Sequence, residues 1–155
     1  MNKRILVSTL VLAGAVLAWS AARVQSAADA TPGACVDCHV KGADGDLRLS
    51  VILAGLTKEV PAALLAKSQA AAPKGVKLKG KHPNVAAMIK SIPDGCLKCH
   101  TKTSKSIPAL SQLMHVIHMT GGDANKFLKS GGACASCHKL DEATGLQPIP
   151  SGAEK

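Results

Sequence analysis

The chain has almost no aromatic side chains. Its 155 residues include one Trp, one Phe and no Tyr. Trp19 lies in an apolar N-terminal stretch, so the rest of the chain has Phe127 alone. Aromatic side chains bury about 150–250 Å² each and usually dominate a core, so something else must fill this one. Their scarcity argues against an RNA-binding module that stacks bases and against a β-sandwich with aromatic-rich strands.

A hydrophobic run long enough to span a membrane is also missing. The apolar run Ile5–Trp19 is shorter than the roughly 20 residues that a span needs. Lys3 and Arg4 precede it, and Ser-Ala-Ala ends at Ala22 or Ala28. This layout predicts a cleaved signal peptide over residues 1–28 rather than an anchor helix. Residues 29–155 then form one exported domain, periplasmic or otherwise outside the cytoplasm.

Cysteine occurs in one pattern only. All six cysteines form three Cys-x-x-Cys pairs, and a histidine follows each pair directly. Only six histidines exist in the chain, so a threefold recurrence is not expected by chance. The three motifs are Cys35-Val-Asp-Cys38-His39, Cys96-Leu-Lys-Cys99-His100 and Cys134-Ala-Ser-Cys137-His138.

This pattern is the attachment signature of c-type haem. On one helical turn, positions i, i+3 and i+4 share a face, so two thiols can form thioethers with the two vinyl groups of one porphyrin. The following imidazole then reaches the iron. Other interpretations remain open: three disulfides in an exported protein, a zinc site built from two of the motifs, or a thioredoxin-like redox pair, which predicts a βαβ context.

Three further histidines remain, His82, His115 and His118, as many as three six-coordinate irons would need as distal ligands. His115 and His118 are three residues apart in an apolar helical pattern, which presents both rings on one face. Alternatives are that some of these histidines lie on the surface, that another subunit donates a ligand, or that methionine does so. Met88, Met114 and Met119 are the candidates, and methionine ligation raises the potential, although methionine is also a common core filler.

With these motifs the chain resembles the small multihaem c-type cytochromes of the c3 and c7 group, which belong to the class III cytochromes c. In that group a His-x-x-His pair gives its two imidazoles to two different haems, as His115-Val-Ile-His118 would. A short strand and a distal histidine also precede a haem motif there, similar to Val76–Lys79 and His82 ahead of Cys96. The resemblance implies a thin protein wrap around three covalent haems. We expect His82 to serve a haem near its own segment and the His115/His118 pair to bridge the other two.

The predicted fold is mainly α with much irregular coil and one short two-stranded ribbon. Patterns predict helices over residues 58–72, 83–92, 108–119 and 123–129, with the last capped by Asp123. The sequence predicts two strands that pair with each other, over the apolar run Leu47–Leu53 and the alternating segment Val76–Lys81. It predicts a turn over Gly42–Asp46. The tail from Gly145 onward, with Pro148 and Pro150, is expected to be extended.

The formal charge of +9 falls to +6 when residues 1–28 are removed, because that segment holds three cations and no acid. Lys74, Lys77, Lys79 and Lys81 form the clearest basic run. It is either a solvated face or a docking surface for an acidic redox partner; nucleic acid is not an expected partner of an exported haem protein.

The sequence thus predicts an electron carrier with three low-potential, bis-histidine haems and no enzymatic activity. Its expected partners are a quinol-oxidising membrane cytochrome and a terminal reductase or outer-surface acceptor, a setting that the resemblance implies. Two alternatives are a small-molecule reductase with one open iron and a subunit of a self-assembling cytochrome filament.

Overall fold

The computed structural model describes residues 35–43 and 45–154. The chain divides into two units, Met1–Thr31 and Pro32–Lys155, and all described residues belong to the second. The predicted signal peptide and both candidate cleavage sites lie outside the described residues. Among the described helices, none is both long and apolar enough to cross a membrane.

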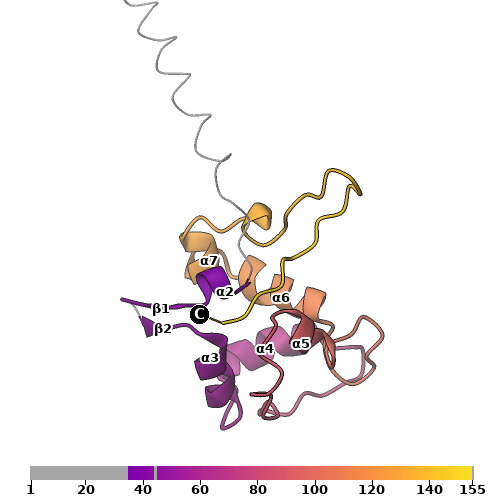
Figure 1. Ribbon diagram of the computed structural model, residues 1–155. Coiled ribbons are helices and arrows are strands. Elements are labelled where there is room, and N and C mark those ends of the chain that lie inside the picture. Colours follow the sequence, from indigo (N-terminus) through magenta and orange to yellow (C-terminus); the bar gives the residue numbers. More distant parts are fainter. Residues whose placement is uncertain (1–34, 44, 155) are drawn as a thin grey trace, which may run out of the picture. The chain divides into compact units, whose positions relative to one another are not determined.

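Short helices joined by irregular segments make up most of the described chain (Figure 1). The only sheet in this part is a ribbon of two-residue strands, β1 and β2, in which Lys41 faces Asp46 and Gly42 faces Gly45. In order, the elements are α2 (Cys35–Cys38), β1 (Lys41–Gly42), β2 (Gly45–Asp46), α3 (Leu49–Leu56), α4 (Ala62–Ala70), α5 (Asp94–Leu97), α6 (Leu110–Met119), the 3-10 turn η1 (Gly122–Ala124), α7 (Lys126–Lys129) and the 3-10 turn η2 (Cys134–Ser136).

Helices α4 and α6 pack against each other and lie within the predicted helical ranges 58–72 and 108–119, which are confirmed. Lys67 of α4 links the two, because its Nζ donates to the carbonyls of Ile117 and Thr120 at 3.2 and 2.9 Å. These carbonyls at the C-terminal end of α6 have no helical N–H to accept from, so a cation there satisfies them and complements the helix dipole. The end of the helix that carries His115 and His118 is thereby fixed.

The predicted pairing of Leu47–Leu53 with Val76–Lys81 is wrong. Most of the first segment folds as helix α3, and the second contains neither helix nor strand. A short apolar run cannot be assigned to helix or strand from its periodicity, and here the run continues through Ala54 to Leu56 as a helix. The ribbon forms instead around the expected turn, at β1 and β2.

The helix predicted over 83–92 is also wrong, because residues 83–85 have no regular structure and residues 86–90 form turns. Asn84 Oδ1 accepts the N–H of Ala86 at 3.1 Å, a local bond that competes with the helical pattern. At the other end, Ile92 exchanges both backbone hydrogen bonds with Gly152, each 2.8 Å long. The predicted short helix over 123–129 is present as η1 and α7, although Asn125 rather than Asp123 caps α7.

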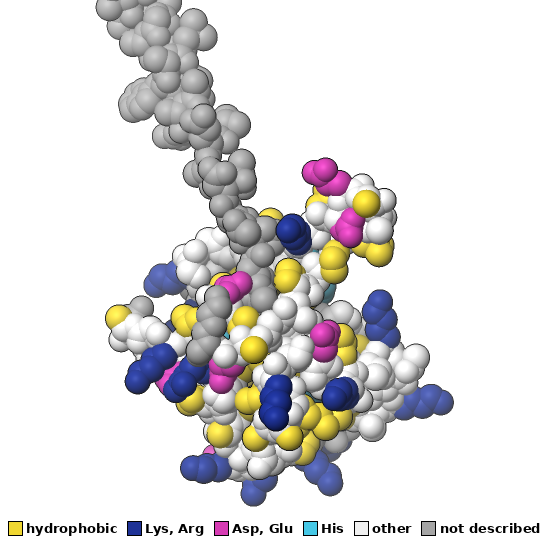
Figure 2. All heavy atoms as spheres, in the orientation of Figure 1, with side chains coloured by type: hydrophobic (Ala, Val, Ile, Leu, Met, Phe, Trp, Pro, Cys, Tyr) yellow, Lys and Arg dark blue, Asp and Glu magenta, His cyan; other side chains and the backbone are white. Residues whose placement is uncertain are grey.

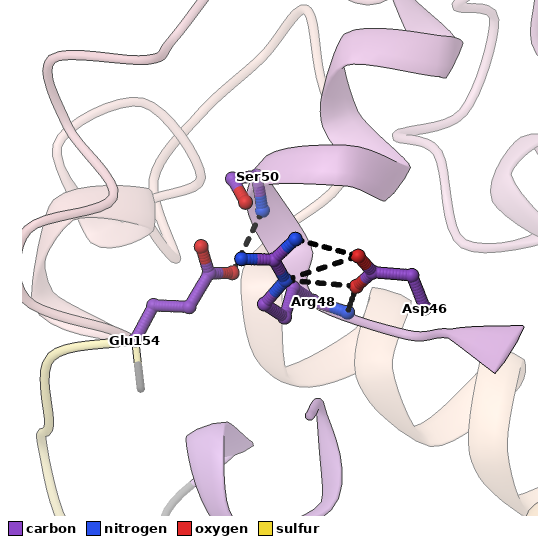
Figure 3. Close-up of polar contacts among 4 residues, drawn as sticks. All are labelled: Asp46, Arg48, Ser50 and Glu154. Atoms are coloured by element: carbon purple, nitrogen blue, oxygen red, sulfur yellow. Dashed lines mark hydrogen bonds and ion pairs between the residues drawn. The ribbon is translucent and has the colours of Figure 1, made fainter. Parts of the chain in front are cut away.

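The C-terminal tail is extended, as predicted, and it runs back across the molecule to the start of α3 (Figure 1). There Glu154 Oε1 accepts the backbone N–H of Ser50 at 2.8 Å (Figure 3). Beside this contact, Arg48 and Asp46 form an ion pair with bonds of 2.6, 2.9 and 3.1 Å. The carboxylate of Glu154 thus satisfies an orphan N–H at a helix start, which the dipole also favours.

The apolar core is small for a domain of this size. Leaving the prolines aside, Val36, Ala71 and Ile92 are the buried hydrophobic side chains among the described residues. Large side chains such as Leu140 and Leu146 remain 53% and 65% exposed. Hydrophobic atoms reach the surface between the Lys and Arg side chains of the face seen in Figure 2. Burial of apolar side chains against other parts of the same chain therefore provides little stabilisation of the fold.

Candidate functional site

Each Cys-x-x-Cys-His motif forms a single helical turn, as the sequence predicts. In all three motifs, the backbone N–H of the histidine donates to the backbone carbonyl of the first cysteine. The N–O distances are 3.0 Å for His39, 2.9 Å for His100 and 2.9 Å for His138. This i to i−4 bond is that of an α-helix, so the two thiols and the imidazole project from one turn.

The three motif histidines share a second contact. The chain loops back after each motif, and a carbonyl eight or nine residues downstream accepts from the ring Nδ1. The acceptors are Leu47 for His39 at 2.9 Å, Pro108 for His100 at 2.8 Å and Gln147 for His138 at 2.7 Å. A carbonyl oxygen only accepts, so Nδ1 carries the proton and Nε2 keeps its lone pair. Histidines that bind metals typically have their other ring nitrogen held in this way.

Every motif histidine also faces one of the other three histidines. The ring centroids are 6.1 Å apart for His39 and His118, 6.1 Å for His82 and His100, and 6.0 Å for His115 and His138. The planes meet at 90°, 10° and 39° respectively. The pairing uses all six histidines and brings together residues from separate parts of the chain.

The constant spacing differs from that of ordinary ring packing. Rings in direct contact change their separation with their tilt, yet these three pairs stay at 6.0–6.1 Å from nearly parallel to perpendicular. The direct edge contact between His118 and Phe127 is shorter, at 5.3 Å. A metal–imidazole bond of about 2 Å on each side, plus about 1.1 Å from nitrogen to ring centre, gives about 6 Å. The centroid separations therefore match the spacing that two imidazoles bound to one iron would have.

The three distal rings are held to different degrees. His82 Nδ1 donates to the carbonyl of Pro83 at 2.8 Å, and His118 Nδ1 donates to that of Met114 at 3.0 Å. Burial lowers the pKa of His118, which favours the neutral form of this ring. His115 is exposed, and its ring makes no hydrogen bond to any described residue. The third pair is thus the least restrained.

All six cysteines lie within the described range and are free thiols. Burial is the main cause that raises the pKa values of Cys35, Cys96 and Cys137. Cys137 and Cys96 lie near enough to Cys35 to raise its pKa further, so the three motifs approach one another. No disulfide joins any two of these six cysteines.

Within residues 35–43 and 45–154, no group of three or more His, Cys, Asp or Glu side chains has the arrangement of a protein-only metal site. Each histidine pair offers two nitrogen donors. A six-coordinate iron that is held by four porphyrin nitrogens has two coordination positions left for such donors. The ring paired with each motif histidine belongs to another histidine, whereas Met88 and Met119 are exposed.

No family model, no curated protein and no solved structure matches this chain. The assignment of the site therefore depends on the residues and their geometry.

Sequence reasoning did not identify the residues that surround His118. Phe127 contacts its ring edge-on, and the buried Asn125 bonds both to the end of α6 and to the start of α7. One signal was available in the sequence, since Phe127 is the only aromatic residue after Trp19.

Proposed function

We propose that this protein is an exported tri-haem c-type cytochrome that carries single electrons between redox partners. The observation that supports it most is the set of three histidine pairs, each joining a Cys-x-x-Cys-His motif to one other histidine at 6.0–6.1 Å. Each motif would attach one haem through its two cysteines, and each pair would provide both axial ligands. Haem supplies one-electron chemistry when bound.

The small core supports the same proposal. Among the described residues, and leaving the prolines aside, three buried hydrophobic side chains are few for a domain of this length. Three porphyrins would add the apolar surface that the chain does not provide through aromatic residues, and would cover exposed groups such as Leu140 and Leu146. The residues present therefore fit three covalent haems better than a self-sufficient protein core.

Helix α6 would bring two of the haem sites close together. It carries His115, paired with the third motif, and His118, paired with the first. Residues three apart on a helix lie about 5–6 Å apart at Cβ, so both sites share one rigid element. His82 and His100 would serve the second site. Short spacing between sites favours electron transfer within one molecule.

Closed bis-histidine sites suit a carrier, because both axial positions are taken by the chain and no substrate can reach the metal. They also favour low potentials, since methionine is the ligand that raises them. The partners would be a quinol-oxidising membrane cytochrome on one side and a terminal reductase or outer-surface acceptor on the other. The exposed lysines near His82, Lys77, Lys79 and Lys81, would attract an acidic partner.

Intact mass and the visible spectrum of the purified protein test this proposal. We expect a mass three haems above that of the exported chain and low-spin c-type bands. Replacing both cysteines of any one motif by serine should remove one haem. A chain that carries no covalent haem would contradict the proposal, and disulfides in its place would revive the alternative interpretation.

The reductase alternative is favoured by one observation, the exposed and unbonded ring of His115. An exchangeable site, if the protein has one, should be the third. Cyanide added to the oxidised protein would then displace His115 before His82 or His118, and His115→Ala should make that reaction faster, because the position is then open. Absence of any reaction with cyanide in the intact protein would leave the carrier as the function.

A further inference from the structure

The ring of Phe127 contacts both the His118 imidazole and a glycine that precedes the third motif. Its centroid is 5.3 Å from that of His118, with the planes at 80°. A Cβ added at Gly132 would lie 2.5 Å from the nearest ring carbon of Phe127. The glycine thus leaves space that the Phe127 ring occupies, and the ring is held against His118.

Hydrogen bonds between the Asn125 side chain and the backbone fix the position of Phe127 relative to α6. Asn125 is 8% exposed, and its Nδ2 donates to the carbonyls of Ile117 and Thr120, both at 2.8 Å. Its Oδ1 accepts the N–H of Phe127 at 3.0 Å. One buried side chain therefore joins the end of the helix that carries His118 to the start of the helix that carries Phe127.

His118 cannot turn freely between these contacts. Its Nδ1 is bonded to the carbonyl of Met114, and Phe127 blocks one side of its ring. The imidazole plane of His118 is at 90° to that of His39, whereas the planes of His82 and His100 are within 10° of parallel. The third pair, at 39°, is intermediate.

The angle between two axial imidazoles determines the electronic structure of a ferric haem. Each imidazole interacts mainly with the iron d orbital that lies perpendicular to its own plane. Parallel rings act on the same orbital and separate the two d orbitals of this type, while perpendicular rings act on both and leave them close in energy. The perpendicular case gives the most anisotropic electron paramagnetic resonance signal, with the highest maximum g value.

We propose that Phe127 is a positioning residue that holds the His118 imidazole perpendicular to that of His39, so that the first haem differs electronically from the other two. This proposal rests on the proposed function, because it concerns ligands of the haem at the first motif. Orientation of a ligand by its neighbours is a known means by which a protein tunes a metal site.

Electron paramagnetic resonance of the frozen, oxidised holoprotein tests it. We expect one signal with a maximum g value well above those of two ordinary rhombic signals. His118→Ala should remove that signal alone and so assign it to the first haem. In Phe127→Leu the signal should shift to lower g, because the aliphatic side chain no longer holds the ring. Phe127→Tyr, which keeps the ring edge, should retain it.

Two further variants separate positioning from general destabilisation. Leu128→Ala lies beside Phe127 in α7 and should leave all three signals in place. Gly132→Ala should shift the same signal as Phe127→Leu with Phe127 intact, because the added methyl group displaces the ring. Three haems by mass with no high-g signal, or a high-g signal unmoved in both Phe127→Leu and Gly132→Ala, would overturn this proposal and leave the cytochrome function standing. A chain without covalent haem would overturn both.

Discussion

His82 and His100 face each other with ring planes only 10° apart and centroids 6.1 Å apart, although 17 residues and a run of turns separate them. Both rings are oriented by backbone carbonyls, His82 by Pro83 and His100 by Pro108. The pair differs from the other two in that neither of its rings comes from α6.

Replacing His82 by methionine should raise the potential of one haem and leave the other two unchanged. Methionine can still reach the iron, and it stabilises the reduced form relative to imidazole. A spectroelectrochemical titration measures this. Lys81→Met is the matched control, because Lys81 is exposed and faces no motif histidine. Three unchanged potentials in His82→Met would remove His82 from the ligand set.

Gly95→Ala should reduce the yield of folded protein and disturb the second motif. An added Cβ would overlap the backbone carbonyl of Met88, which cannot move aside as a flexible side chain would. Overpacking of this kind costs about 1–3 kcal/mol or more. Chemical denaturation monitored by circular dichroism measures the loss.

The control is Gly55→Ala in α3, where an added Cβ has no atom within 4 Å. Removing a glycine from a helix interior should stabilise the protein by about 0.5–1 kcal/mol. Equal effects of the two substitutions would contradict the close approach at Gly95.

Asn125→Ala should destabilise the protein by about 1–3 kcal/mol, because it leaves the N–H of Phe127 without a partner and removes one of the two donors to each of the carbonyls of Ile117 and Thr120. Thermal unfolding of the two proteins under identical conditions gives the difference. Asn84→Ala provides the control, since Asn84 is exposed and makes one local bond to Ala86. A larger loss in Asn84→Ala than in Asn125→Ala would be inconsistent with the role assigned to Asn125.

The stabilising effect of Asp46 should disappear in acid. Its hydrogen bonds with Arg48 lower the pKa of the Asp46 carboxyl from 3.8 to about 2. A carboxyl whose pKa is lower in the folded than in the unfolded chain stabilises the fold above the unfolded pKa, and loses that effect as pH falls towards the folded one. Melting temperatures of the wild type and Asp46→Asn should therefore differ at pH 7 and 5 and converge between about pH 4 and 2.

The same substitution at Asp123 tests whether this pH dependence is specific. Asp123 is exposed and has no ion pair with any described residue. Asp123→Asn should change the melting temperature little over the range in which the Asp46→Asn difference closes. A difference for Asp46→Asn that persists at pH 2 would show that the ion pair with Arg48 is not its cause.

Residues that follow a local pattern were predictable. The stripe of Leu110, Leu113, Met114 and Ile117 identifies α6, and the motif spacing identifies the single turns at each Cys-x-x-Cys-His. Elements that depend on contacts with residues distant in the sequence could not be predicted. The segment ahead of Pro93 ends in a bridge from Ile92 to Gly152, which no local pattern indicates, and α3 begins where Glu154 reaches Ser50.

The candidate site likewise has features that follow from local sequence and features that depend on distant residues. The sequence identifies the candidate thiols and imidazoles because their chemistry follows from residue type and spacing. It cannot supply ring orientations, because the 90° of His39 and His118 depends on Phe127 and Asn125, which approach from a later helix.

The most direct test of the central claim is the visible spectrum of the dithionite-reduced protein, recorded with and without carbon monoxide and alongside its intact mass. If each of the three histidine pairs encloses one iron, as proposed, the spectrum should show sharp c-type bands and no change on adding the gas, and the mass should include three added haems. A mass without haem would contradict the cytochrome assignment, and a shifted Soret band would show that at least one pair does not close its iron.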